Sequence, residues 1–325
     1  MSTHPASATK SLVIREPVDL IALAPVVLGF QPEESVVLET FDGASGSFHA
    51  RADLSRGHPD QDAVARHLVA AAERNGAVQA AVVVFSAHLA RARRQGRVLR
   101  DLLHGAGIQV IDVLCADGTR FHQLNGGKAA PGSAYDLAAH PFLVQHVFDG
   151  QIVHPTRDGL ARTLVAIDGP DRDEVAAAVD RFTKRPSGAG ALRAEALWIQ
   201  GCIRRFRRTR RALAAPEAGR LLALCRCDEL WEVAWSEMER PHGDAHVEFW
   251  RDLVRRAPED LVGRTAGLLA FAAWLHGDGA LAWCAIERSR EGGLQDELAE
   301  EVGVALMGAR PPDSWTPFRA GVFDT

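Results

Sequence analysis

Residues 78–86 read Val-Gln-Ala-Ala-Val-Val-Val-Phe-Ser, a nearly continuous apolar run that is rich in valine. A strand without polar alternation is typical of the interior of a sheet, where both faces of the strand are covered. This run therefore predicts that the first half of the chain is built around a sheet with helices on its faces.

The segments around this run alternate between strand and helix patterns. Strand-type residues occupy 47–54, a helical period covers 61–74, a second helix is expected over 87–104, and a further strand over 108–114. Strands that alternate with helices pair in parallel through right-handed crossovers. The order predicts a sheet that is at least partly parallel.

Two loops predict antiparallel pairs in the same sheet. Strand-type residues over 35–40 and 47–54 flank Asp42-Gly43-Ala44-Ser45-Gly46, a loop with the composition of a hairpin turn. Ala116-Asp117-Gly118 likewise turns the chain back into a strand over 119–124. The sheet is therefore expected to be mixed.

The N-terminal segment is expected to contribute one buried helix. Residues 1–10 are small and polar without periodicity and predict a disordered tail. A short strand is expected over 11–15, and Glu16-Pro17 begins a helix over 18–28, which is apolar on nearly all sides. Together these segments predict a mixed-sheet α/β sandwich domain over residues 11–150.

From residue 157 onward the sequence shows helical periods and no convincing strand. A cluster of turn residues over 125–134 ends the strand region, and a short helix is expected over 136–147. Further helices are expected over 171–182, 190–213, 217–239, 245–256, 262–275, 280–290 and 294–307. Residues 151–325 are therefore expected to form an all-α helical bundle.

One pair of these helices resembles a tetratricopeptide-type hairpin. Small residues at Ala270, Ala282 and Ser289 allow close approach of two helices, and Trp274 and Ile286 fill the seam between them. One such unit is clear, whereas a repeat array normally needs roughly three. The pattern favours a hairpin within a compact bundle over a solenoid.

The composition is that of a soluble globular protein. The chain has 325 residues, 47% of them hydrophobic and 24% charged, and this length favours two domains. No stretch approaches the roughly 18 apolar residues of a spanning helix, and the N-terminus lacks the pattern of a signal peptide. A cytoplasmic protein without a membrane anchor is expected, with its five scattered cysteines reduced.

An arginine cluster is the strongest local charge feature. The net charge of −5 argues against a nucleic-acid binder that relies on overall charge. Six arginines nevertheless lie close together: Arg204, Arg205, Arg207, Arg208, Arg210 and Arg211. They suit a polyanion, a nucleic acid or an acidic partner. The alternative is a solvated helix face in which nearby acids such as Glu195 and Glu217 pair with the arginines.

Two places at the sheet edge carry candidate ligand-binding residues. Glu33, Glu34 and Ser35 lie between a helix and a strand, where they are either ligand contacts or part of a solvent-facing turn. Ser86 ends the 78–86 run, and open α/β sheets bind ligands outside the carboxyl ends of their strands. The helix that follows would favour an anion, although the simpler role of Ser86 is that of an N-cap.

The best candidate metal ligands are two cysteines and two histidines, Cys225, Cys227, His242 and His246. The single residue between the cysteines is shorter than the usual spacing, and on a helix the two thiols would point to different sides. Pro241-His242-Gly243 also resembles a turn between helices. We therefore predict no metal site and no cofactor, with buried thiols and exposed imidazoles instead.

Several blocks of this sequence resemble an actinobacterial family known as domain of unknown function 4192. They are Ile14-Arg15-Glu16-Pro17-Val18-Asp19-Leu20, Leu28-Gly29-Phe30-x-Pro32-x-x-Ser35, Arg51-x-Asp53-Leu54 and Trp274-x-x-Gly277-Asp278-Gly279-Ala280. The likeness covers most of residues 11–310. It implies a bacterial cytoplasmic setting and supports the division into two domains, but the family has no established activity to carry over.

Three hypotheses for the function follow. The first is a non-enzymatic protein-interaction or regulatory module, in which the helical half binds a protein partner. The second is a small-ligand binder or an enzyme that uses a cleft between the halves, with Glu33, Glu34, Asp53, Ser86 and Arg157 as wall residues. The third is polyanion binding through the arginine cluster.

Overall fold

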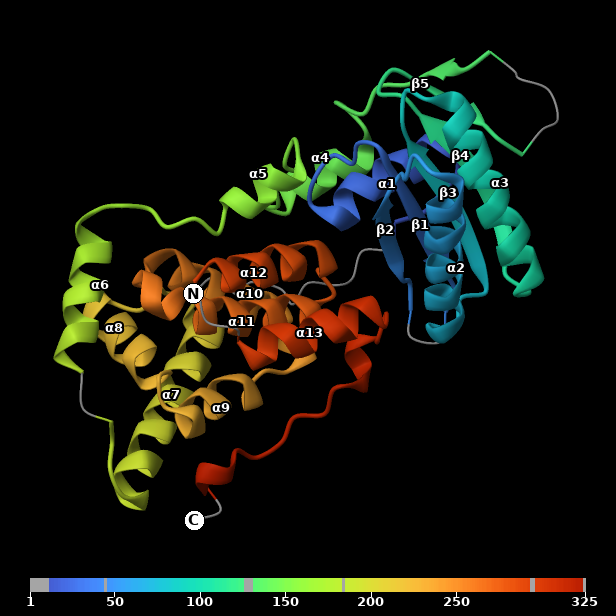
Figure 1. Ribbon diagram of the computed structural model, residues 1–325. Coiled ribbons are helices and arrows are strands. Elements are labelled where there is room, and N and C mark those ends of the chain that lie inside the picture. Colours follow the sequence, from blue (N-terminus) through green and yellow to red (C-terminus); the bar gives the residue numbers. More distant parts are fainter. Residues whose placement is uncertain (1–11, 44–45, 126–130, 183–184, 293–295, 324–325) are drawn as a thin grey trace. The chain divides into compact units, whose positions relative to one another are not determined.

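The computed structural model describes residues 12–43, 46–125, 131–182, 185–292 and 296–323. The chain divides into two compact units, residues 1–156 and 157–325. Within the described residues, the first unit carries all of the strands and the second is built from helices (Figure 1). The tail expected over residues 1–10 lies outside the described part.

The sheet of the first unit is mixed, as expected. Its strands are β1 (Ser35–Phe41), β2 (His49–Asp53), β3 (Gln79–Phe85), β4 (Gln109–Ala116), β5 (Arg120–Gln123) and β6 (Ser133–Ala134), in the spatial order β2-β1-β3-β4-β5-β6. β3 and β4 pair in parallel, and the other neighbours pair antiparallel. The valine-rich run forms β3, which is buried after Gln79 and lies inside the sheet, as predicted.

Helices cover both faces of the sheet (Figure 1). α2 (His58–Arg74) and α3 (Leu89–Gly105) cover one face, where alternate strand residues such as Leu38, Val82 and Val113 form a core with them. The other face packs against α1 (Pro17–Leu28), most of whose residues are buried. Burial of apolar side chains in both layers is what stabilises the unit.

Two expectations for the first unit are wrong in detail. Residues 12–15 form no strand, and the side chains of Leu12 and Val13 are exposed, because none of the described strands pairs with this segment. The helix expected from residue 136 begins only at Pro141, as α4 (Pro141–Phe148). There the His140 ring caps the helix by accepting a hydrogen bond from the Phe142 backbone N–H.

The second unit contains nine helices in its described part. They are α5 (Arg157–Arg162), α6 (Pro170–Arg181), α7 (Ala189–Thr209), α8 (Ala215–Leu224), α9 (Asp228–Ser236), α10 (Gly243–Arg256), α11 (Glu259–His276), α12 (Gly279–Glu291) and α13 (Glu297–Met307). Short 3-10 turns lie at Arg240–His242, Pro312–Ser314 and Gly321–Phe323. Each helix of the described chain is too short or too polar to span a bilayer.

α11 is the central helix of this unit. It is buried along most of its length and contacts α10, α12 and α13.

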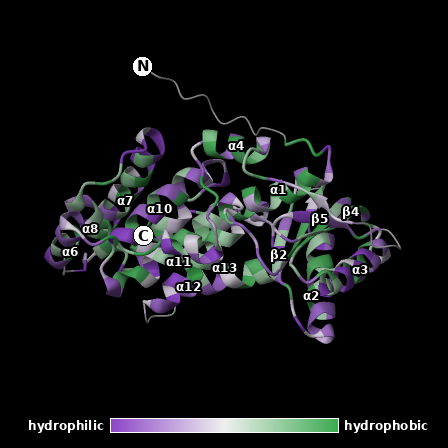
Figure 2. Cartoon of the chain, turned by 90° about the horizontal axis from the view of Figure 1, so that it is seen from above, coloured by the Kyte–Doolittle hydropathy of each residue, from purple (hydrophilic) through white to green (hydrophobic). Residues whose placement is uncertain are grey.

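Helices nearer the surface carry polar residues on one side and apolar residues on the other. The mixed purple and green of α2 and α3 in the first unit shows this composition (Figure 2). α11 and α12 form a close helical hairpin, in which the Ser289 hydroxyl donates to the Gly263 carbonyl at 2.8 Å. Nothing in this geometry identifies the hairpin as a tetratricopeptide unit.

The long helix expected over 217–239 is two helices. α8 ends at Leu224, and α9 begins after Cys227, whose backbone is extended. The break lets α8 pack on α6, with Gly219 against Ala178, while α9 packs on α7. Sequence periodicity missed the break because Cys225-Arg226-Cys227 contains neither glycine nor proline.

One strongly polar side chain is buried inside the sheet. Glu39 of β1 is 0% exposed, and neither of its carboxyl oxygens has a hydrogen-bond partner among the described residues. Burial raises the pKa of Glu39 well above its ordinary value of 4.5. His49 lies directly opposite in β2, and burial lowers its pKa to about 4. Both groups therefore favour their neutral forms in the folded protein.

We expect Glu39→Gln to stabilise the protein at alkaline pH. The folded state binds the Glu39 proton more tightly than the unfolded chain does, so this group lowers the free energy of unfolding as the pH rises from about 4.5 through the raised pKa. At pH 8 the variant should be more stable than wild type by about 1 kcal/mol or more, and the difference should shrink toward pH 5.

Urea unfolding of both proteins at several pH values measures this effect. Data above pH 6.5 isolate Glu39, because the lowered pKa of His49 weakens folding only as the pH falls from 6.5 toward 4. Parallel pH profiles for wild type and Glu39→Gln would show that ionisation of Glu39 does not affect stability.

Candidate functional site

The sheet pairing brings four sequence-predicted residues to one edge. Because β1 runs antiparallel to β3, Ser35 at the start of β1 pairs with Phe85 at the end of β3. Asp53 at the end of β2 pairs with Ser35 on its other side. Glu34, Ser35, Asp53 and Ser86 therefore gather at the edge where the parallel strands β3 and β4 end, the usual position of ligands in open α/β sheets.

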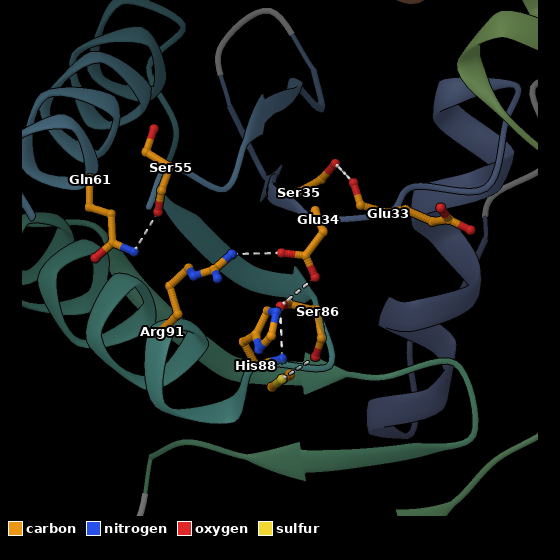
Figure 3. Close-up of polar contacts among 9 residues, drawn as sticks. Glu33, Glu34, Ser35, Ser55, Gln61, Ser86, His88 and Arg91 are labelled. Atoms are coloured by element: carbon orange, nitrogen blue, oxygen red, sulfur yellow. Dashed lines mark hydrogen bonds and ion pairs between the residues drawn. The ribbon is translucent and has the colours of Figure 1, made fainter. Parts of the chain in front are cut away.

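Glu34 is the centre of this edge site (Figure 3). Its carboxylate accepts a hydrogen bond from the Ser86 hydroxyl at 2.7 Å and pairs with the Arg91 guanidinium at 2.8 Å. The Glu34 backbone is left-handed, with φ 39°, which costs a residue other than glycine about 1 kcal/mol or more. The Leu54 N–H holds that backbone by donating to the Glu34 carbonyl at 2.7 Å.

Ser86 connects Glu34 to the start of α3. The backbone N–H of His88 donates to the Ser86 hydroxyl oxygen at 3.0 Å, while that hydroxyl donates to Glu34. His88 is the N-cap residue of α3, so Ser86 lies two positions before the cap instead of forming it. The first turn of α3 holds no acidic residue and contains Arg91. The Glu34 carboxylate thus supplies the negative charge that a helix N-terminus favours.

Ser35 and Asp53 belong to a second, structural set of contacts. The Arg51 guanidinium donates to the Ser35 hydroxyl at 2.9 Å and pairs with Asp53 at 2.6 Å. The Ser35 hydroxyl in turn donates to the Glu33 carbonyl at 2.5 Å, and Ser35 is fully buried. The Glu33 carboxylate points away from the cluster (Figure 3). Of the two glutamates in the predicted turn, only Glu34 directs its carboxylate toward the edge site.

The edge site contains two arginines that sequence reasoning missed, Arg51 and Arg91. Each had a signal: Arg51 belongs to the Arg51-x-Asp53 block, and Arg91 lies in the first turn of the helix after the valine-rich strand. Both pair with carboxylates at this edge. The edge site is therefore a mixed-charge cluster, with two arginines in addition to the residues that the sequence predicted there.

Arg157, the remaining predicted wall residue, belongs to the second unit. It begins α5 in the second unit, where its guanidinium pairs with Glu287 of α12 at 2.8 Å. Two cavities of about 580 and 310 Å³ are lined by residues outside the edge site. The Glu34 side chain is 49% exposed, so the cluster lies at an edge that water reaches.

Acidic side chains neutralise much of the arginine cluster. Its ion pairs join Arg204 to Glu237, Arg205 to Glu217, Arg207 to Glu239, and Arg210 to Asp244 and Glu248. In the described part of the chain the side chains of Arg208 and Arg211 have no acidic partner, and Glu195 pairs with Arg220 instead. This pairing weakens the case for a phosphate-binding surface, because carboxylates already neutralise four of the six guanidinium groups and only two remain for a ligand.

The candidate metal ligands do not form a site. Cys225 and Cys227 are buried thiols, as expected, and burial raises the pKa of Cys225 to about 12. His246 on α10 is 1% exposed, and neither of its ring nitrogens has a hydrogen-bond partner among the described residues, so the expectation of an exposed imidazole is wrong for this residue. It lies on the face of α10 that packs into the core. Among residues with described positions, no group of three His, Cys, Asp or Glu side chains is arranged to hold a metal ion.

We expect Arg207→Ala and Arg208→Ala to differ in stability. The Arg207 side chain is 19% exposed and pairs with Glu239, so its removal should lower the free energy of unfolding by about 1 kcal/mol through lost packing and a lost ion pair. Exposed Arg208 should matter by less than about 0.5 kcal/mol. Urea unfolding measures the free energy of unfolding of both variants. Equal losses would contradict the view that Arg207 contributes to the fold and that Arg208 does not.

Comparison with known proteins identifies the family. No curated protein and no solved structure matches the chain. The model of the family described as Domain of unknown function (DUF4192) matches residues 17–312, which include the edge site and most of both units. Because the match covers most of the sequence, the chain belongs to the DUF4192 family.

Proposed function

We propose that this chain is a binding protein whose first unit recognises an anionic group at the edge site. The observation that supports this role is the Glu34 carboxylate, held between the Ser86 hydroxyl and the Arg91 guanidinium at the carboxyl end of β3. A ligand carboxylate or phosphate can make the same two contacts. In this proposal Glu34 occupies the position of the ligand when none is bound.

The electrostatics of the edge favour such a ligand. The first N–H groups of α3 have no partners inside the helix, and the helix dipole adds partial positive charge at the same end. Arg91 lies in that turn and Arg51 lies nearby on β2. The main opposing charges are the carboxylates of Glu34 and Asp53.

Glu34 is well placed to give way to a ligand. Its side chain is 49% exposed, so water already reaches the carboxylate. Its left-handed backbone is a strained conformation, and strain that persists at a polar edge is a reason to suspect function there. Rotation of the Glu34 side chain toward solvent would free Ser86 and Arg91 together.

Anion binding by the full chain tests this proposal, with inorganic phosphate and succinate as probes in calorimetric titrations. We expect Arg91→Gln to weaken binding roughly tenfold, because it removes a charge-assisted hydrogen bond. Glu34→Gln should strengthen binding, because it removes the competing negative charge. Arg97→Gln is the matched control, since Arg97 is exposed on the same helix and outside the edge site.

Two results would overturn the proposal. One is anion affinity that Arg91→Gln and Arg97→Gln change equally. The other result is that neither phosphate nor succinate binds to wild type or to Glu34→Gln. Glu34→Gln lacks the carboxylate that competes for the site, so it should bind an anion if the site exists.

The other sequence-based hypotheses remain predictions. A protein-interaction or regulatory role for the helical half draws support from the close α11–α12 hairpin, which the sequence likens to a tetratricopeptide unit. Polyanion binding now rests mainly on Arg208 and Arg211. That the protein is cytoplasmic and comes from an actinobacterium likewise remains a prediction from the sequence.

A further inference from the structure

The chain beyond α13 runs as an extended arm along the helices of the second unit (Figure 1). This C-terminal arm, residues 310–323, contains two short 3-10 turns, Pro312–Ser314 and Gly321–Phe323, and no longer helix or strand. Its first turn contacts α11, and its second turn contacts α7 and α9. The arm therefore lies on several helices of the same unit in the way that a bound peptide would.

Two aromatic side chains anchor the arm. The Trp315 ring packs against Trp235 of α9 and Phe271 of α11, with ring centroids 5.3 and 4.9 Å apart. The Phe318 ring lies 4.9 Å from the Trp235 ring. The Trp315 indole Nε1 donates to the Met238 carbonyl at 3.3 Å. Trp235 and Phe271 thus form an aromatic platform for the arm, and buried aromatic anchors of this kind supply much of the affinity at protein interfaces.

Small apolar residues hold the far end of the arm. Ala320 is 1% exposed and Val322 is 6% exposed. Between them, the backbone N–H of Gly321 donates to the Glu232 carboxylate of α9 at 3.3 Å. The anchors of the arm therefore have the sequence pattern Trp-x-x-Phe-x-Ala-x-Val, which a separate extended segment could present in the same way.

The contacts of the arm are those of a detachable segment. Phe318 is 37% exposed, and opening of the arm breaks no strand and no helix longer than one turn. Chain ends with few backbone hydrogen bonds belong to the least stable parts of a fold. The family match ends at residue 312, so it includes the aromatic platform and excludes the anchors of the arm. An open arm would leave Trp235 and Phe271 as an aromatic surface, which is typical of an interaction site.

We propose that the aromatic platform binds an extended segment of a partner protein that carries tryptophan and phenylalanine three residues apart. The C-terminal arm is then an autoinhibitory segment, which occupies the platform until a partner displaces it. Because the arm is tethered, it competes at an effective concentration on the order of millimolar. The inference concerns the second unit alone and is independent of the edge site.

Binding of the arm as a separate peptide tests this inference. The probe is a fluorescent peptide of residues 311–323, titrated with the full chain and followed by anisotropy. We expect Trp315→Ala/Phe318→Ala to bind the peptide at least tenfold more tightly than wild type does, because its own arm no longer competes well. Thr316→Ala is the matched control, since Thr316 is exposed between the two anchors, and it should behave as wild type does. A peptide with the same two alanines should not bind.

Two results of this titration would overturn the inference. One is that the peptide does not bind to the double variant, once thermal unfolding has shown that the variant is folded. The other is that wild type and the double variant bind the peptide equally, because binding would then occur away from the aromatic platform.

Hydrogen exchange of wild type is a second readout that needs no variant. The backbone N–H groups of Trp315, Gly321 and Phe323 are hydrogen bonded, so their exchange reports opening of the arm. We expect them to exchange at least a hundredfold faster than the buried amides of α11, because the arm opens by itself. Exchange as slow as that of α11 would make the arm part of the cooperative core and would overturn the inference.

Sedimentation separates a different partner protein from a second copy of this chain. A wild-type protein that stays monomeric at high concentration supports a segment from a different protein. Wild-type dimers that Trp315→Ala/Phe318→Ala abolishes would show that two copies exchange their arms, as in domain swapping, and would overturn the assignment to a different protein.

Discussion

The antiparallel pairing of β1 with β3 is the contact on which the first unit depends. It inserts β1 between β2 and β3, so that the helix connecting β2 to β3 must pass across a strand that comes earlier in the chain. The same pairing places the residue before β1, Glu34, beside the end of β3 and the start of α3. It also buries Glu39 deep in the sheet. The register between β1 and β3 therefore determines both the apolar layer between the sheet and its helices and the polar edge around Glu34.

Much of the fold was predictable, because its signals are local. The valine-rich run, the hairpin loop and the helical periods each depend on neighbouring residues, and the mixed sheet and the helical second half followed from them. The failures needed distant information. Residues 12–15 have the composition of a strand but no strand to pair with, and the break at Cys225-Arg226-Cys227 is set by packing of α8 and α9 on different helices.

The candidate sites were harder to predict than the fold, since they depend on contacts between distant residues. Arg91 meets Glu34 across 57 positions, and Arg207 meets Glu239 across 32. A sequence shows that an arginine cluster exists but not which acids neutralise it. The cavity of about 580 Å³ in the second unit combines residues of α9, α11 and the start of α13, and no sequence motif links Trp231 to Glu297. Local periodicity therefore indicates where helices form, whereas charge pairing becomes visible only in three dimensions.

The edges of the sheet have a consequence for the behaviour of the protein in concentrated solution. β2, at one edge, has five residues and carries Arg51 and Asp53, and β6, at the other edge, has two residues. Short or charged edge strands offer a neighbouring molecule little free backbone on which to add a strand. The sheet is thus protected at both ends against growing from one molecule into the next, the first step toward fibrous aggregates.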